Sequence, residues 1–126
     1  MSNKKKILII EDEAAFQKIL SEFLGTEGFE TLSALDGESG LEMARSQNPD
    51  LVLLDIILPK KDGYEVLAEL KKDEKTKNIP VILLTNLESP EDVGKALQLG
   101  ASTYLVKADY KLEEITQKIK ELLKIN

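Results

Sequence analysis

The sequence predicts an α/β protein with a doubly wound, five-stranded parallel sheet and helices on both of its faces. Two observations predict this fold. Apolar runs of strand length alternate with segments of helical periodicity, which gives roughly five β/α units in a row. Several runs are apolar at every position, as in LVLL from Leu51 to Leu54, a pattern typical of strands buried on both faces. We expect residues 1–126 to form a single domain, since this length supports one core.

The first unit begins near the amino terminus. We expect a strand from Lys6 to Ile10, followed by a helix from about Glu13 to Leu24 that Gly25 or Gly28 ends. One face of this helix is expected to be apolar and to comprise Phe16, Ile19, Leu20, Phe23 and Leu24.

The next two units follow turn signals. A weaker strand is expected at about 30–34, and Asp36-Gly37 turns the chain into a short helix. The third strand is Leu51 to Leu54, which leads into Asp55, and its helix begins near Gly63.

The last two units complete the alternation. VILLT at 81–85 is an apolar strand, and Ser89 and Pro90 read as the N-cap and first position of the next helix, which Gly100 stops. STYLV at 102–106 is the final strand. The apolar stripe of a closing helix consists of Ile115, Ile119, Leu122 and Leu123.

Composition excludes several kinds of chemistry. The chain has no cysteine and no histidine, which excludes disulfides, Ser/His/Asp triads and histidine-bound or thiolate-bound metals. With 17 Lys+Arg against 23 Asp+Glu, the net charge of −6 disfavours non-specific binding to nucleic acid or anionic lipid. No apolar run approaches transmembrane length and no signal peptide is evident, so we expect a cytoplasmic protein without membrane contact.

Functional groups follow four of the five expected strands. Glu11 and Asp12 come after the first strand, Asp55 after the third, Thr85 ends the fourth and Lys107 follows the fifth. In an open parallel sheet the ligand crevice lies outside the carboxyl ends of the strands. If the strand order is 2-1-3-4-5, these side chains meet at one edge, with Asp55 central.

This combination favours phosphoryl chemistry. Carboxylates gathered in one crevice need a compensating cation, and magnesium prefers one or two carboxylates with waters and a phosphate oxygen. A hydroxyl and an ammonium opposite them can hold phosphoryl oxygens, so that attack by Asp55 on phosphorus would give an aspartyl phosphate. Taken singly, Asp12 and Asp55 can be caps, Thr85 a loop hydroxyl and Lys107 a strand-end lysine. Their coincidence at strand ends argues for a site.

The motifs ILIIED, LVLLDIILPKKDG, VILLT and YLVK, at their spacings, resemble the receiver domain of two-component response regulators, in a stand-alone, chemotaxis-regulator-like form. The resemblance covers essentially the whole chain and implies the flavodoxin-like strand order 2-1-3-4-5. It implies that Asp55 accepts a phosphoryl group from a phosphohistidine on a sensor histidine kinase or histidine phosphotransfer protein. The domain would be a switch that assists only its own phosphorylation and dephosphorylation, and not an enzyme acting on other substrates.

The resemblance also assigns metal ligands. Mg²⁺ would be bound directly by Asp12, through water by Glu11, by the phosphoacceptor Asp55 and by the backbone carbonyl of Ile57. The family often has an aspartate where this chain has Glu11, whose longer arm can still reach metal-bound water.

The remaining roles concern the switch. Thr85 would hydrogen-bond one phosphoryl oxygen, Lys107 would pair with another, and Tyr104 would turn inward when Thr85 is drawn to the phosphate. The family usually follows its lysine with a cis proline, whereas this chain has Ala108. Since a cis bond before a non-proline residue costs about 3 kcal/mol, a trans bond is expected there. Leu87, like Ile57, would flank the path of the hydrolytic water.

The expected output follows from the same resemblance. The switching face would comprise the fourth helix, fifth strand and fifth helix, roughly Glu91 to Lys124, and would bind an unidentified downstream protein. We expect no direct nucleic-acid partner, and a monomer or a phosphorylation-dependent dimer.

Three other functions compete with this interpretation. Haloacid-dehalogenase-like phosphatases need a second aspartate two residues after the first, where this chain has Ile57. Flavodoxins need a hydroxyl- and glycine-rich phosphate loop after the first strand, and EDEAAFQK is not one. A receiver-like module that is never phosphorylated would not need the intact constellation, and Mg²⁺-dependent labelling would distinguish it.

Overall fold

The computed structural model describes residues 4–85, 90–107 and 111–125, with the side chains of 85 and 90–93 excepted. Its elements are β1 Lys6–Ile10, α1 Ala14–Thr26, β2 Glu30–Ala34, α2 Gly37–Gln47, β3 Leu51–Asp55, α3 Gly63–Lys72, β4 Val81–Thr85, α4 Pro90–Gln98, β5 Thr103–Val106 and α5 Leu112–Leu123. None of the helices in these described ranges has the length and apolar character needed to cross a membrane.

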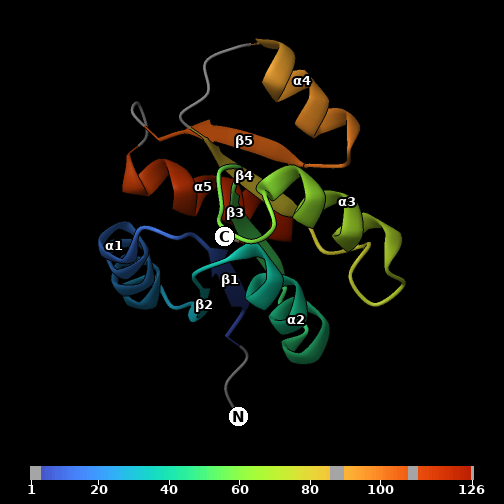
Figure 1. Cartoon of the computed structure of the whole chain (residues 1–126). Coiled ribbons are helices and arrows are strands. Elements are labelled where there is room, and N and C mark those ends of the chain that lie inside the picture. Colours follow the sequence, from blue (N-terminus) through green and yellow to red (C-terminus); the bar gives the residue numbers. More distant parts are fainter. Residues whose placement is uncertain (1–3, 86–89, 108–110, 126) are drawn as a thin grey trace.

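The strands form one parallel sheet in the order β2-β1-β3-β4-β5, which confirms the predicted topology. Figure 1 shows α1 and α5 on one face of the sheet and α2, α3 and α4 on the other. The chain moves from β1 outward to β2 and then crosses to β3 on the other side. The carboxyl ends of β1 and β3 are therefore neighbours at the switch point of the sheet, where α/β proteins bind ligands.

Alternate residues of the central strands enter two separate apolar clusters. On the α2, α3 and α4 face the strand residues are Leu8, Ile10, Val52, Leu54, Val81 and Leu83. On the α1 and α5 face they are Ile7, Ile9, Leu51, Leu53, Ile82 and Leu84. Because both faces of the sheet are covered, each of these positions is apolar, which explains the uninterrupted apolar runs in the sequence.

Helix α1 packs most of its predicted apolar face on the sheet, because Leu20 and Leu24 are buried and Phe16 and Phe23 pack, partly buried, against the same cluster. The buried residues are Gln17, Leu20 and Leu24, at the i, i+3, i+7 spacing of one helix face. Ile19, expected on that face, is 50% exposed. It lies about 100° around the helix from Leu20, on the flank of the stripe. The expectation for Ile19 was therefore wrong, and a polar residue takes part in the buried stripe.

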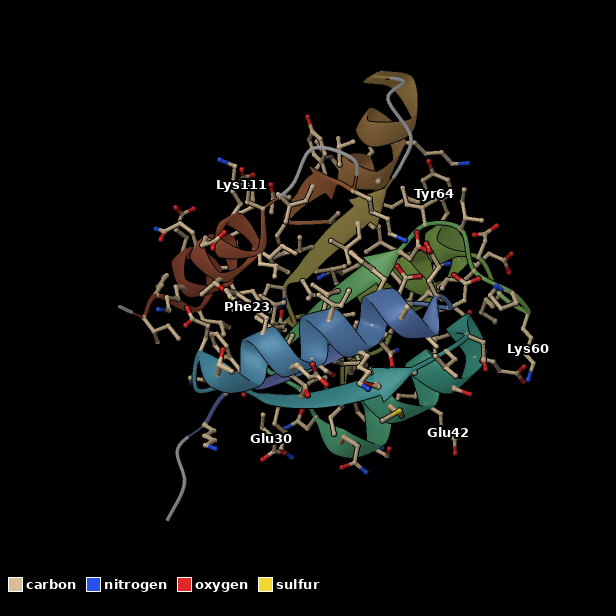
Figure 2. The ribbon with its side chains drawn as sticks, turned by 90° about the vertical axis from the view of Figure 1, so that its left-hand side faces the viewer. Phe23, Glu30, Glu42, Lys60, Tyr64 and Lys111 are labelled. Carbon is tan, nitrogen blue, oxygen red and sulfur yellow. The ribbon has the colours of Figure 1, made fainter. Side chains whose placement is uncertain are left out.

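The loops after the strands gather at one end of the molecule. In Figure 2 the blue helix α1 crosses the front with its first turn on the right, on the same side as the labelled Lys60 and Tyr64. Glu30, at the start of β2, lies away from that side. The end of the sheet that carries the predicted site residues is thus also the end at which α1 begins.

Candidate functional site

Three carboxylates meet where β1 and β3 end. Glu11 and Asp12 follow β1, Asp55 is the last residue of β3, and each offers an oxygen that lies within 4.8 Å of the other two. Glu11 is fully buried and Asp55 is 5% exposed, whereas Asp12 is exposed. The structure thus brings the three predicted acids together, with one of them open to solvent.

Backbone groups hold Glu11 in place. Its own N–H donates to the carbonyl of Ala34 at the end of β2, at 3.0 Å. Its Oε2 accepts the N–H of Glu13, also at 3.0 Å. Its Oε1 is also buried and forms an ion pair with the ammonium of Lys107, and the described residues give it no further hydrogen-bond donor.

Lys107, which directly follows β5, contacts acidic residues at the carboxyl ends of β1 and β3. Its Nζ forms an ion pair with Glu11, lies 3.0 Å from Asp55 Oδ2 and 3.3 Å from Glu13 Oε1. Only 8% of its side chain is exposed, and the ammonium sits 4.9 Å from the centre of the Phe16 ring. One cation therefore faces several carboxylates, and the local charge remains negative.

Burial and neighbouring charges shift the pKa values of Glu11 and Lys107. Burial raises the pKa of Glu11 to about 7, and the charge of Asp55 adds to this, against the hydrogen bond from the Glu13 N–H and the contact with Lys107. Burial would lower the pKa of Lys107, but its hydrogen bonds with Glu11 and Asp55 outweigh burial and raise that pKa. Lys107 therefore stays protonated, and additional positive charge near Glu11 would favour the ionised form of its carboxyl group.

The loop after Asp55 folds back sharply. The N–H of Ile57 lies 3.3 Å from Asp55 Oδ1, and the N–H of Gly63 donates to the carbonyl of Ile56 at 2.6 Å. A Cβ at position 63 would lie 2.4 Å from the Ile56 Cα and 2.5 Å from the Asp55 carbonyl oxygen. Only glycine allows this approach, so the glycine of LPKKDG sets the path of the loop beside the carboxylate.

A pocket lies next to Asp55 and Lys107. It is lined by Asp12, Glu13, Asp55, Ile57 and Lys107. Of these residues, Ile57 is 63% exposed. The lining thus combines acidic side chains, one ammonium and one aliphatic side chain, which suits a metal-bound phosphoryl group.

The other predicted residues lie on β4 and β5. Thr85 is the last residue of β4, with its backbone in register with Val106 of β5, and its side chain lies outside the described part. Tyr104 on β5 is 39% exposed. Leu87 and Ala108 lie outside the described residues, so the peptide geometry after Lys107 stays a prediction. The proposed roles of Thr85, Tyr104 and the Ile57 carbonyl also stay predictions.

Sequence reasoning did not identify three neighbours of the site. Glu13 pairs with Lys107, Phe16 lies under its ammonium, and the Gln17 amide binds the carbonyl of Glu11. The signal for Gln17 was present, because it precedes Leu20 and Leu24 at helical spacing in an otherwise apolar stripe. The third acid of EDE likewise indicated a further carboxylate at the end of β1.

The donor set fits a hard divalent cation. It consists of the oxygens of three carboxyl groups, of which that of Asp12 is exposed, and apart from the Lys107 ammonium the buried Glu11 Oε1 has no hydrogen-bond donor among the described residues. A single ammonium does not neutralise three carboxylates. Magnesium, which keeps several waters and takes one or two carboxylates, matches such a half-open site better than a fully caged ion would.

Known proteins resemble this chain over nearly its whole length. The "Probable transcriptional regulator ycf27" of Cyanophora paradoxa is 41% identical over 122 residues, which are 97% of this chain and 49% of that protein. The "DNA-binding dual master transcriptional regulator RpaA" of Synechocystis is 38% identical over 119 residues, 94% of this chain and 49% of that protein. The chain thus spans about half the length of these relatives.

A solved structure shows the same fold. The receiver domain of the sensor histidine kinase PA1611 from Pseudomonas aeruginosa superposes with a TM-score of 0.88 at 28% identity, covering 96% of this chain and 98% of that one. In that structure a magnesium ion is coordinated in the active site cleft.

The expectation that nucleic acid is not a direct partner was wrong, because a relative that is 38% identical over 119 residues is named a DNA-binding regulator. The expectation came from the net charge of −6. That charge describes the surface of these 126 residues alone and carries no information about the other half of the relatives.

Residues 7–120 match the family described as "Response regulator receiver domain". This match spans most of the chain and agrees with the fold, with the acidic cluster at the switch point and with the relatives. The chain therefore belongs to the receiver domains of two-component response regulators, the phosphoacceptor signalling switches of these systems.

Proposed function

We propose that this receiver domain accepts a phosphoryl group on Asp55 from a phosphohistidine donor. One observation carries the proposal: Asp55, nearly buried, still lines the pocket, and its Oδ2 lies 3.0 Å from Lys107 Nζ. Mg²⁺ would be held by the carboxylates of Asp12 and Asp55, by the backbone carbonyl of Ile57 and, through water, by Glu11. The mutual approach of the three carboxylates supports this ligand set.

The transfer step uses a carboxylate nucleophile. An oxygen of Asp55 attacks phosphorus, the phosphorus–nitrogen bond of the phosphohistidine breaks, and its electron pair goes to the donor imidazole. When bound, magnesium neutralises charge on the phosphoryl oxygens. The chain would assist only this transfer and the later hydrolysis of its own acyl phosphate. It would therefore act as a switch and not as an enzyme on other substrates.

Lys107, Thr85 and Tyr104 would report the new charge. After transfer, the ammonium of Lys107 pairs with one phosphoryl oxygen and the hydroxyl of Thr85 donates to another. Tyr104, now 39% exposed, turns inward into the space that Thr85 leaves. This readout is supported by the position of Tyr104 on β5, three residues before Lys107, and by the register of β4 with β5.

The output would pass through the face formed by α4, β5 and α5. We propose that its effect is control of transcription, because relatives 38–41% identical are named transcriptional regulators. We also propose that residues 1–126 act as one receiver unit, since both apolar clusters pack on the same sheet.

The test is covalent labelling. The protein is incubated with phosphoramidate and Mg²⁺, and intact mass spectrometry follows the gain of one phosphoryl group, with hydroxylamine lability as the mark of an acyl phosphate. Asp55→Asn should abolish the gain while circular dichroism stays that of the parent. Asp62→Asn is the control, because asparagine preserves the cap that Asp62 provides to α3. Labelling of the Asp55→Asn variant at the parent's rate would overturn the proposal.

A further inference from the structure

Gln17 places a buried amide beneath the acidic loop. The residue is 7% exposed and lies in the first turn of α1. Its Nε2 is 2.8 Å from the carbonyl oxygen of Ala34, 3.3 Å from that of Ile9 and 3.3 Å from that of Glu11. Two N–H groups thus serve three carbonyls, all of them backbone groups.

These carbonyls belong to the ends of two strands. Ile9 and Glu11 lie at the end of β1, and Ala34 is the last residue of β2. The carbonyl of Ala34 also accepts the N–H of Glu11. The Gln17 side chain of α1 therefore hydrogen-bonds to the backbone where the chain leaves β1 and enters the acidic loop.

Packing alone does not explain a glutamine at this position. The next residues of the same stripe, Leu20 and Leu24, are fully buried and apolar. A buried amide must recover the hydrogen bonds that it made to water. The Gln17 amide nitrogen donates to the backbone carbonyls of Ile9, Glu11 and Ala34, which surround the start of the acidic loop. The polar group of Gln17 therefore contacts the start of the acidic loop, whereas Leu20 and Leu24 pack in the apolar cluster.

We propose that Gln17 is a positioning residue for the divalent-cation site. By holding the carbonyls of Ile9 and Glu11, it fixes the direction in which the Glu11 and Asp12 side chains leave β1. Removal of a group that hydrogen-bonds to a metal ligand and orients it commonly weakens metal binding about 10- to 100-fold. This inference rests on the proposed function, since it concerns the same Mg²⁺ site.

The experiment measures Mg²⁺ affinity directly, without phosphoryl transfer. Mg²⁺ alone is titrated into the parent and into Gln17→Met while amide NMR shifts of the β1 and β3 ends are followed. Methionine keeps an unbranched chain of similar length and removes both donors. We expect the dissociation constant to rise about tenfold or more. Leu20→Ala is the matched control: it damages the same stripe of α1, lowers the melting temperature and should leave the affinity within twofold of the parent.

The Mg²⁺ affinities are compared at a temperature at which all variants are folded. Equal affinity in Gln17→Met and the parent overturns the inference, as does equal weakening by Leu20→Ala. If Gln17→Met does not fold, Gln17→Asn keeps the amide but shortens its reach, and an unchanged affinity there also overturns it. If the parent itself binds no Mg²⁺, the proposed metal site fails and this inference with it. If the parent binds Mg²⁺ and Gln17→Met binds it equally tightly, only the inference about Gln17 fails and the proposed metal site stands.

Discussion

Lys107 Nζ lies 3.0 Å from Asp55 Oδ2, although 52 positions separate the two residues and β4 lies between their strands. The same ammonium contacts Glu11 and Glu13, so acids from two loops share one cation. Any added charge on Asp55 must change this arrangement. Since Lys107 directly follows β5, we expect such a change to reach the strand that carries Tyr104.

Lys107→Ala is expected to separate labelling from switching. The nucleophile and its acidic neighbours remain, so phosphoramidate should still add a phosphoryl group, whereas no ammonium reads the new charge. Amide NMR shifts around Tyr104 should therefore move little when beryllofluoride and Mg²⁺ are added. Lys18→Ala serves as the control, because Lys18 is an exposed lysine of α1 whose ion pair with Glu22 spans 4.0 Å. Shifts as large as the parent's in Lys107→Ala would contradict the role.

Gly63→Ala should damage both stability and labelling. The added Cβ would lie 2.4 Å from the Ile56 Cα and 2.5 Å from the Asp55 carbonyl oxygen, so backbone must move. Overpacking of this kind costs about 1–3 kcal/mol of unfolding free energy, and the displaced Asp55 should react more slowly. Urea denaturation and the labelling rate measure the two effects.

Gly94→Ala is the opposite case. A Cβ at position 94 meets nothing within 4 Å, and the residue lies inside α4. Alanine there should raise the unfolding free energy by about 0.5–1 kcal/mol. The clash explanation for Gly63 is wrong if both variants change stability in the same direction.

Regular features of the sequence were sufficient to predict the fold and the acidic edge. Runs such as Leu51–Leu54 require cover on both faces, and parallel strands bring the groups after their carboxyl ends together. The rotation of α1 was not predictable in the same way. The apolar pattern includes Ile19 in the core, whereas tertiary packing leaves Ile19 50% exposed. Gln17 has the helical spacing of a core residue, but its polar side chain argued against the burial that the structure shows. The contacts of Lys107 with Glu13 and Phe16 depend on side-chain rotamers, which no sequence pattern encodes.

Asp36 gives a pH-dependent prediction for stability. Its carboxylate caps α2 by accepting the Ser39 N–H at 2.8 Å, and this bond first of all, with help from Lys60, lowers its pKa from the usual 3.8. A lowered folded-state pKa means that the contribution is present above pH 3.8 and is lost as pH falls through the folded-state pKa. Asp36→Ala should therefore lower the melting temperature by several degrees at neutral pH. The decrease should be smaller at pH values below the folded-state pKa of Asp36.

Asp36→Asn tests the origin of this effect. Asparagine caps a helix about as well as aspartate but does not titrate. Its melting temperature should stay close to the parent's at neutral pH, and its advantage over Asp36→Ala should persist in acid. A gap between the parent and Asp36→Ala that is the same at every pH would show that the carboxylate charge contributes nothing.

The lifetime of the phosphoryl group gives the last prediction. Ile57, 63% exposed, lines the pocket beside Asp55, and by the family resemblance Ile57 and Leu87 flank the path of the hydrolytic water. Aliphatic groups there offer the water no hydrogen bond, so the phosphorylated state should be long-lived. An Ile57→Asn, Leu87→Glu double variant should lose phosphate several-fold faster once donor is removed at saturating Mg²⁺. Leu35→Asn is the control, since Leu35 is 51% exposed and is not among the pocket-lining residues. An equal or slower rate in the double variant would mean that hydrolysis is governed by the acidic cluster and not by these side chains.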